Sequence, residues 1–134
     1  MSKSLIQIAN SSQQTVAVGS VISLGSVLRR FGCNCRLNGD AIEIEGDGYY
    51  TIDANITATP TAAGDVTVSV LKDGVVIPGA TSTDSVTTVG NSATLSINTT
   101  VRIGCRCDGA DALTLTLLEG PGVISNVSMR VIKQ

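Results

Sequence analysis

The four cysteines of this chain come in two closely spaced pairs, Cys33 with Cys35 and Cys105 with Cys107. Residues i and i+2 of a β-strand point to the same face, so each pair would place two sulfur atoms side by side. Three chemistries are open to them: reduced thiols packed as small apolar side chains, disulfide bonds, or a four-thiolate zinc site. The one-residue spacing is tighter than in most structural zinc sites, which counts against zinc.

Other catalytic constellations are scarce. The chain has no histidine, which excludes Ser-His-Asp and Cys-His arrangements and every histidine metal site. A small acidic group remains, Asp40, Glu43, Glu45 and Asp47. It fits either a calcium site or glycosidase-like pair, or the solvated edge of a sheet, and the missing EF-hand spacing favours the edge. We therefore expect no catalytic residue, no cofactor and, apart from the zinc alternative, no metal.

Composition narrows the classes of partner. The formal net charge is −2 and Arg29-Arg30 is the only adjacent basic pair, so we expect no nucleic-acid binding, which needs a concentrated positive face. No apolar run approaches the roughly 18 residues of a membrane span, and the first residues lack the apolar core of a signal peptide. Only 15% of residues are charged and the mean hydropathy is +0.31, which favours an oligomer that covers apolar surface.

Apolar and polar residues alternate along much of the chain. Between Tyr50 and Ala58 every second residue is mostly apolar, and this two-residue period predicts a strand with one buried and one polar face. Asp73-Gly74 predicts a tight turn, because both residues tolerate positive φ. The same signals predict strands at Leu5–Ala9, Thr15–Val18, Val21–Leu24, Val27–Phe31, Ala41–Glu45, Tyr50–Ala58, Val66–Val70, Thr83–Val89, Ala93–Ile103, Leu113–Leu118 and Val123–Ile132.

Many short strands separated by turn residues, with no helical spacing, predict an all-β sandwich or jelly roll. A length of 134 residues is typical of one domain, so we expect a single domain over residues 1–134. With no Trp, one Phe and two Tyr, its core must consist of Val, Ile, Leu and Ala.

Four segments follow one another in a distinctive order: IQIANSSQQTVAVGSVI, GDGYYTIDANITATPTAAGDVTVSVLKDGVVIPGA, VRIGCRCDGADALTLTLLEG and ISNVSMRVIKQ. Together they resemble the bacterial and phage branch of the C1q/TNF-like jelly-roll superfamily. Members of this branch include tip domains of spore-surface collagen-like proteins and small virion proteins of tailed phages. The resemblance implies a jelly roll of about ten antiparallel strands that assembles as a compact trimer and serves display, adhesion or reinforcement.

In the resembled topology the second and next-to-last strands are neighbours. This would bring the two cysteine pairs close together and suggests one or two cross-strand disulfides, such as Cys33 with Cys105 or Cys107, beside the thiol and zinc alternatives. The strands that start at Tyr50, Ala93 and Val123 would share a sheet with the first strand, with their non-core face toward a threefold axis. That face is either an ordinary solvent-facing surface or a trimer interface with hydrogen-bonded and aliphatic contacts. Its interface candidates are Asp53, Asn55, Thr57, Asn98, Thr100 and Asn126.

No Gly-X-Y stalk accompanies the resemblance, which favours a standalone structural protein. Our first hypothesis is a trimeric capsid decoration or head-projection protein of a tailed phage, made in the bacterial cytoplasm and placed on the virion surface. Its partners would be its own copies and the major capsid protein or another virion protein. The alternative is a trimeric adhesin of a bacterial cell or spore surface. It would recognise glycan or protein through the loops Pro60–Gly64, Pro78–Asp84 and Asp108–Asp111, although few aromatic residues are available for sugar binding.

Overall fold

The computed structural model describes residues 4–32, 34–104 and 111–133. These residues form strands and no helix, so none of them belongs to a helix that would cross a membrane. The strands are β1 (Leu5–Asn10), β2 (Gln14–Val16), β3 (Ser26–Phe31), β4 (Cys35–Asn38), β5 (Ala41–Ile44), β6 (Gly48–Pro60), β7 (Gly64–Lys72), β8 (Val75–Val86), β9 (Ala93–Ile103), β10 (Asp111–Glu119) and β11 (Gly122–Lys133).

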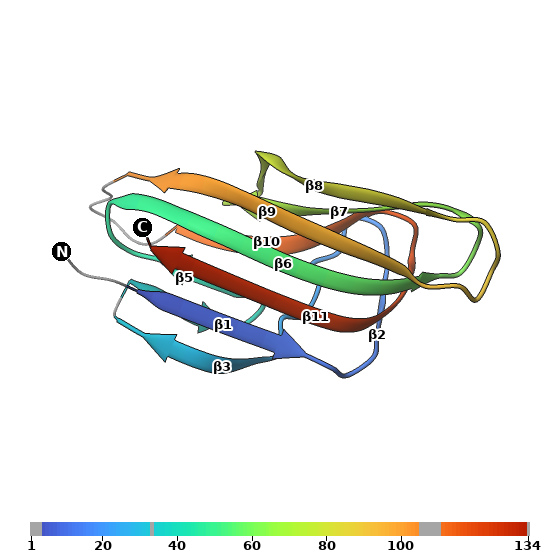
Figure 1. The fold of residues 1–134 in the computed structure, drawn as a ribbon, viewed down its shortest axis with the longest axis horizontal. Coiled ribbons are helices and arrows are strands. Elements are labelled where there is room, and N and C mark those ends of the chain that lie inside the picture. Colours follow the sequence, from blue (N-terminus) through green and yellow to red (C-terminus); the bar gives the residue numbers. More distant parts are fainter. Residues whose placement is uncertain (1–3, 33, 105–110, 134) are drawn as a thin grey trace.

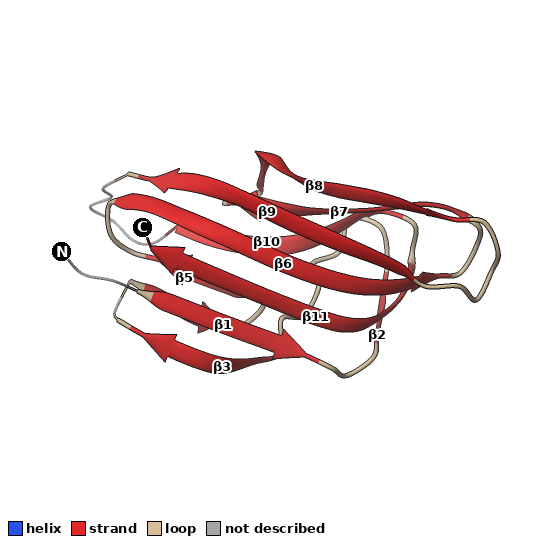
Figure 2. Cartoon of the chain, in the orientation of Figure 1, coloured by secondary structure: helices blue, strands red, loops and turns tan. Residues whose placement is uncertain are grey.

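Two antiparallel sheets lie face to face (Figures 1 and 2). Sheet I has the order β3-β1-β11-β6-β9, and β2 also pairs with β11. Sheet II has the order β4-β5-β10-β7-β8. Strands distant in the sequence are therefore neighbours in space, as β1 and β11 are at the register Leu5 opposite Ile132.

The core fills the space between the sheets with aliphatic side chains from both of them. Alternation determines which residues enter it: Ile52, Ala54 and Ile56 of β6 point inward and are fully buried. Leu113, Leu115 and Leu117 of β10 do the same from sheet II. Tyr50 is the largest fully buried side chain, and its hydroxyl donates a hydrogen bond to the Gly46 carbonyl at 2.9 Å.

The predicted jelly-roll class is confirmed, and most predicted strands are present. Ala93–Ile103 has the predicted bounds. The turn after Lys72 is also confirmed, since Asp73 and Gly74 have φ of 52° and 84°. The structure has eleven strands within its described residues, against the ten or so expected.

Two strand predictions need correction, and one strand was missed. Val21–Leu24 forms only an isolated bridge between Val21 and Thr116, although Ile22 and Leu24 are buried in the core. The strand expected at Thr83–Val89 starts earlier and ends at Val86. Strand β4 was not predicted, although it has the same length as β5, which was.

Replacement of a central core residue should destabilise the fold strongly. Leu115 is fully buried on the middle strand of sheet II, so Leu115→Ala should lower the free energy of unfolding by about 2–5 kcal/mol through lost burial and a residual cavity. Val89 is 62% exposed, and Val89→Ala should change it by less than about 0.5 kcal/mol. Urea titrations of the two variants measure this; equal midpoints would contradict the assigned core.

Candidate functional site: the outward face of sheet I

The face of sheet I that points away from the core is lined by side chains arranged in rungs across the strands. On one rung, Asp53 of β6 lies between Asn98 of β9 and Arg130 of β11. Gln7 of β1 lies next to Arg130 on its other side. The Arg130 guanidinium donates to the Asp53 carboxylate at 2.8 Å, and both side chains are partly exposed. A solvated pair of this kind contributes about 0–1 kcal/mol to folding, so it adds little to the stability of the sheet.

The next rung is built from small polar residues. Asn55 lies opposite Ser96 and Ser128, and the Ser96 hydroxyl donates to the Asn55 side-chain oxygen at 2.8 Å. Between this rung and the Asp53 rung the surface has a shallow polar depression of about 190 Å³. Gln7, Asp53, Asn55, Ser128 and Arg130 line it.

The remaining predicted residues extend the same face. Thr57 lies opposite Thr94 and Asn126, next to a register shift between Ile124 and Asn126. Thr100 lies opposite Thr51 near the other end of the sheet. The structure therefore brings all six candidates onto one face of one sheet, and contact of this face with other copies stays a prediction. The six are Asp53, Asn55, Thr57, Asn98, Thr100 and Asn126.

One end of this outward face is apolar. Aliphatic contacts were predicted on this face, but no residues were named for them. Leu5 lies opposite Ile132 on one side and Phe31 on the other. Phe31, the only phenylalanine of the chain, is 56% exposed, and so is Tyr49 at the same end. All six residues of β3 are exposed and its pairing with β1 shifts register. The sequence of β3 therefore shows no alternation from which the face of Phe31 could be predicted.

Cys35 is the only one of the four cysteines within the described residues. It is a free, buried thiol on β4, and burial raises its pKa to about 11, against the opposing effect of the charges of Arg30 and Lys133. Cys33, Cys105 and Cys107 lie outside the described residues, so the disulfide and zinc alternatives stay predictions. No group of three metal-ligating residues occurs in the described part of the chain.

The segment around Cys35 is fixed by the side chain of Asn34. Its oxygen accepts a hydrogen bond from the Ser4 hydroxyl at 2.6 Å, and its amide nitrogen donates to the Glu45 carbonyl at 2.7 Å. The same region holds Tyr50, whose pKa burial raises to about 12, with further contributions from Cys35 and Asp47. These contacts join the start of β1, the β3–β4 connection and the β5–β6 turn.

The acidic group forms an ion-pair cluster at the edge of sheet II. Arg36 on β4 donates to Glu43 at 2.8 Å and to Glu45 at 3.2 Å. Hydrogen bonds from Asn38 and then from Arg36 lower the pKa of Glu43. Both carboxylates are thus paired with Arg36, while Asp40 and Asp47 are exposed. This arrangement is typical of a solvated sheet edge rather than of a catalytic pair.

The loops proposed for an adhesin are only partly loops. Pro78–Asp84 lies within β8, so this loop assignment is wrong. Residues 108–110 lie outside the described residues, and Asp111 is the buried first residue of β10. Residues 61–63 form an exposed connection between β6 and β7 without an aromatic side chain.

No protein-family model and no curated protein matches the chain. Solved structures match it over nearly their full length. Murine APRIL superposes with a TM-score of 0.76 at 9% identity, covering 99% of this chain and 100% of that one. The globular domain of zebrafish complement 1qA gives 0.72 at 9% identity, covering 94% of each chain. The PRD1 vertex protein P5 gives 0.61 at 11% identity, covering 97% and 96%.

The fold is a C1q/TNF-like jelly roll. Identities near 10% show the fold alone. Any function must therefore be inferred from the surface of this C1q/TNF-like jelly roll. Within this framework β6, β9, β11 and β1 share sheet I, as the resemblance implied.

The buried thiol of this jelly roll predicts a measurable dependence on pH. Because burial raises the Cys35 pKa to about 11 in the folded state, whereas a solvent-exposed thiol in the unfolded chain loses its proton near pH 9.0, the free energy of unfolding should fall as the pH rises through this interval. Cys35→Ala should make the decline shallower. Denaturant titrations between pH 8 and 11 compare the two proteins, and identical slopes would contradict burial of this thiol.

Proposed function

We propose that this chain is a non-enzymatic structural protein of a tailed-phage virion that assembles as a homotrimer through the outward face of sheet I. It would decorate the capsid or project from the head, in contact with the major capsid protein or another virion protein. The observation that carries the proposal is this face itself: an extended surface with small polar rungs at its centre and an apolar end.

The face has the properties that favour association between copies. Several of its polar side chains are already paired within the chain, as Asn55 is with Ser96, so their ordering on assembly costs little conformational entropy. Phe31 and Tyr49 at the apolar end provide the aromatic anchors that usually dominate binding energy. The Asp53–Arg130 pair would be partly desolvated by a partner, which penalises misaligned copies more than it adds affinity.

One structural neighbour is consistent with the virion assignment. The PRD1 vertex protein P5 has this fold over nearly the whole chain, so the architecture is compatible with a role in a virus particle. The adhesin alternative is weakened, because the Pro78–Asp84 segment proposed as a recognition loop is part of strand β8. The acidic group gives no support to an enzymatic role, because Glu43 and Glu45 are paired with Arg36 and the chain has no histidine to act as their partner.

A charge placed in the middle of the outward face should prevent assembly. Asn55→Arg would bury three uncompensated guanidinium groups in the trimer, each costing about 3 kcal/mol or more, so dissociation should shift to at least about a hundredfold higher concentration. Val89→Arg adds the same charge on an exposed residue outside this face and should leave the trimer intact. Sedimentation velocity measures the mass against the 13.7 kDa of one chain; a monomeric wild type at micromolar concentration would contradict the trimer.

The virion assignment has its own test. Particles induced from the bacterium that carries the gene, purified on a density gradient, should contain this chain in the same fractions as the major capsid protein by mass spectrometry. Recovery in a spore-coat or cell-wall fraction instead would contradict the virion role and favour the adhesin, while the trimer result would stand.

A further inference from the structure

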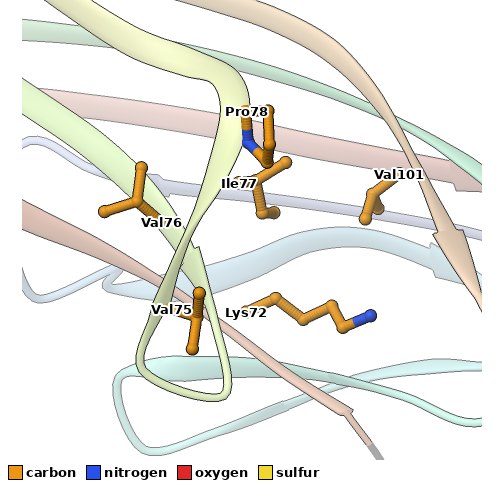
Figure 3. A pocket seen from close by; sticks show the side chains of 6 residues that line it. All are labelled: Lys72, Val75, Val76, Ile77, Pro78 and Val101. Atoms are coloured by element: carbon orange, nitrogen blue, oxygen red, sulfur yellow. The ribbon is translucent and has the colours of Figure 1, made fainter.

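A second hollow of similar volume lies where β8 leaves regular pairing with β7. Leu71 pairs with Val76 and Ser69 with Thr81, so Ile77, Pro78, Gly79 and Ala80 lie opposite Val70 alone. This bulge carries β8 away from β7, with Ile77 and Ala80 buried. The resulting hollow of about 190 Å³ is lined by Lys72, Val75, Val76, Ile77, Pro78 and Val101 (Figure 3).

The frame around this hollow is fixed before any ligand arrives. The Asp73-Gly74 turn is held against β10, because the Asp73 amide donates to the Ala112 carbonyl at 2.9 Å and the Ala112 amide donates to the Asp73 carboxylate at 3.0 Å. Pro78 fixes its own φ, and Gly79 takes a φ of 83° that a residue with a side chain rarely adopts. A preformed site loses little free energy to ordering when it binds.

The chemistry of the lining is apolar with one cation. Five of the six lining side chains are aliphatic or proline, and Val75 is 69% exposed beside them. Figure 3 shows the Lys72 side chain extended along the hollow toward Val101 with its ammonium group at the free end. Within the described residues this ammonium has no ion pair with a carboxylate. The hollow therefore complements a molecule with one negative charge and a short hydrocarbon part.

We propose that this hollow binds a short-chain aliphatic carboxylate, whose charge pairs with Lys72 while its chain packs on Val76, Ile77 and Val101. Size supports a small ligand: the volume equals roughly six water molecules at about 30 Å³ each, below the roughly 300 Å³ of sites for drug-sized molecules. A chain of about four to six carbons fits it. The hollow is open on one side, so the carboxylate stays partly solvated and we expect dissociation constants in the millimolar range.

The test is a titration of the full chain with hexanoate, followed by amide chemical shifts. Saturable shifts confined to residues 72–78 and 101 are expected, with hexylammonium causing none. Lys72→Gln should weaken binding up to about fivefold, as for a partly solvated ion pair, and Lys72→Arg should retain it. Arg29→Gln, which removes one positive charge from exposed β3, should bind as wild type does and serves as the matched control. Val75→Ser, at an exposed position, should weaken binding without affecting folding.

Each outcome decides the proposal. Shifts that do not saturate, that spread over the surface, or that persist unchanged in Lys72→Gln would overturn it. If hexanoate binds a monomeric variant such as Asn55→Arg but not the wild-type assembly, a second copy occupies the hollow in place of a small molecule, and the proposal is likewise overturned. None of these results bears on the virion assignment, which the particle fractions test separately.

Discussion

Burial of aliphatic side chains between two sheets is the interaction on which the rest of this structure depends. Because a strand alternates its side chains, the choice of Ile52, Ala54 and Ile56 as core residues also fixes Asp53 and Asn55 as outward ones. The polar face of sheet I is therefore a direct consequence of core packing. Shifting β6 by one residue would bury the carboxylate and the amide and expose the isoleucines, so the register is strongly determined.

Departures from this regularity produce the special features of the surface. The register shift in β11 between Ile124 and Asn126 places Asn126 beside Thr57 on the outward face. The bulge in β8 interrupts the edge of sheet II and opens the hollow beside Lys72. Bulges also protect sheet edges from unwanted pairing, and Pro78 reinforces this protection at the same place. One local irregularity thus both limits edge-to-edge aggregation and shapes a pocket.

The sequence predicted what alternation and turn chemistry control, and it missed what depends on distant pairing. The Ala93–Ile103 strand and the Asp73-Gly74 turn follow from local patterns, and both were predicted correctly. The six outward residues could be named because a two-residue period assigns faces. The partner of Asp53, in contrast, is Arg130, 77 residues away, and only the register of β6 on β11 reveals it. Strand β3 could not be assigned to a face, because its sequence, SVLRRF, does not alternate and all of its residues are exposed.

The pairing of β1 with β11 determines how the molecule can carry a load. Leu5 lies opposite Ile132, so the first residue of β1 and the end of β11 meet at one end of the sandwich. Tension applied between these two points would open the antiparallel ladder one hydrogen-bonded rung after another, which needs little force. A pull transmitted through the broad outward face would instead load many rungs in parallel. Mechanically, this jelly roll is suited to being held by its face rather than by the adjacent ends of β1 and β11.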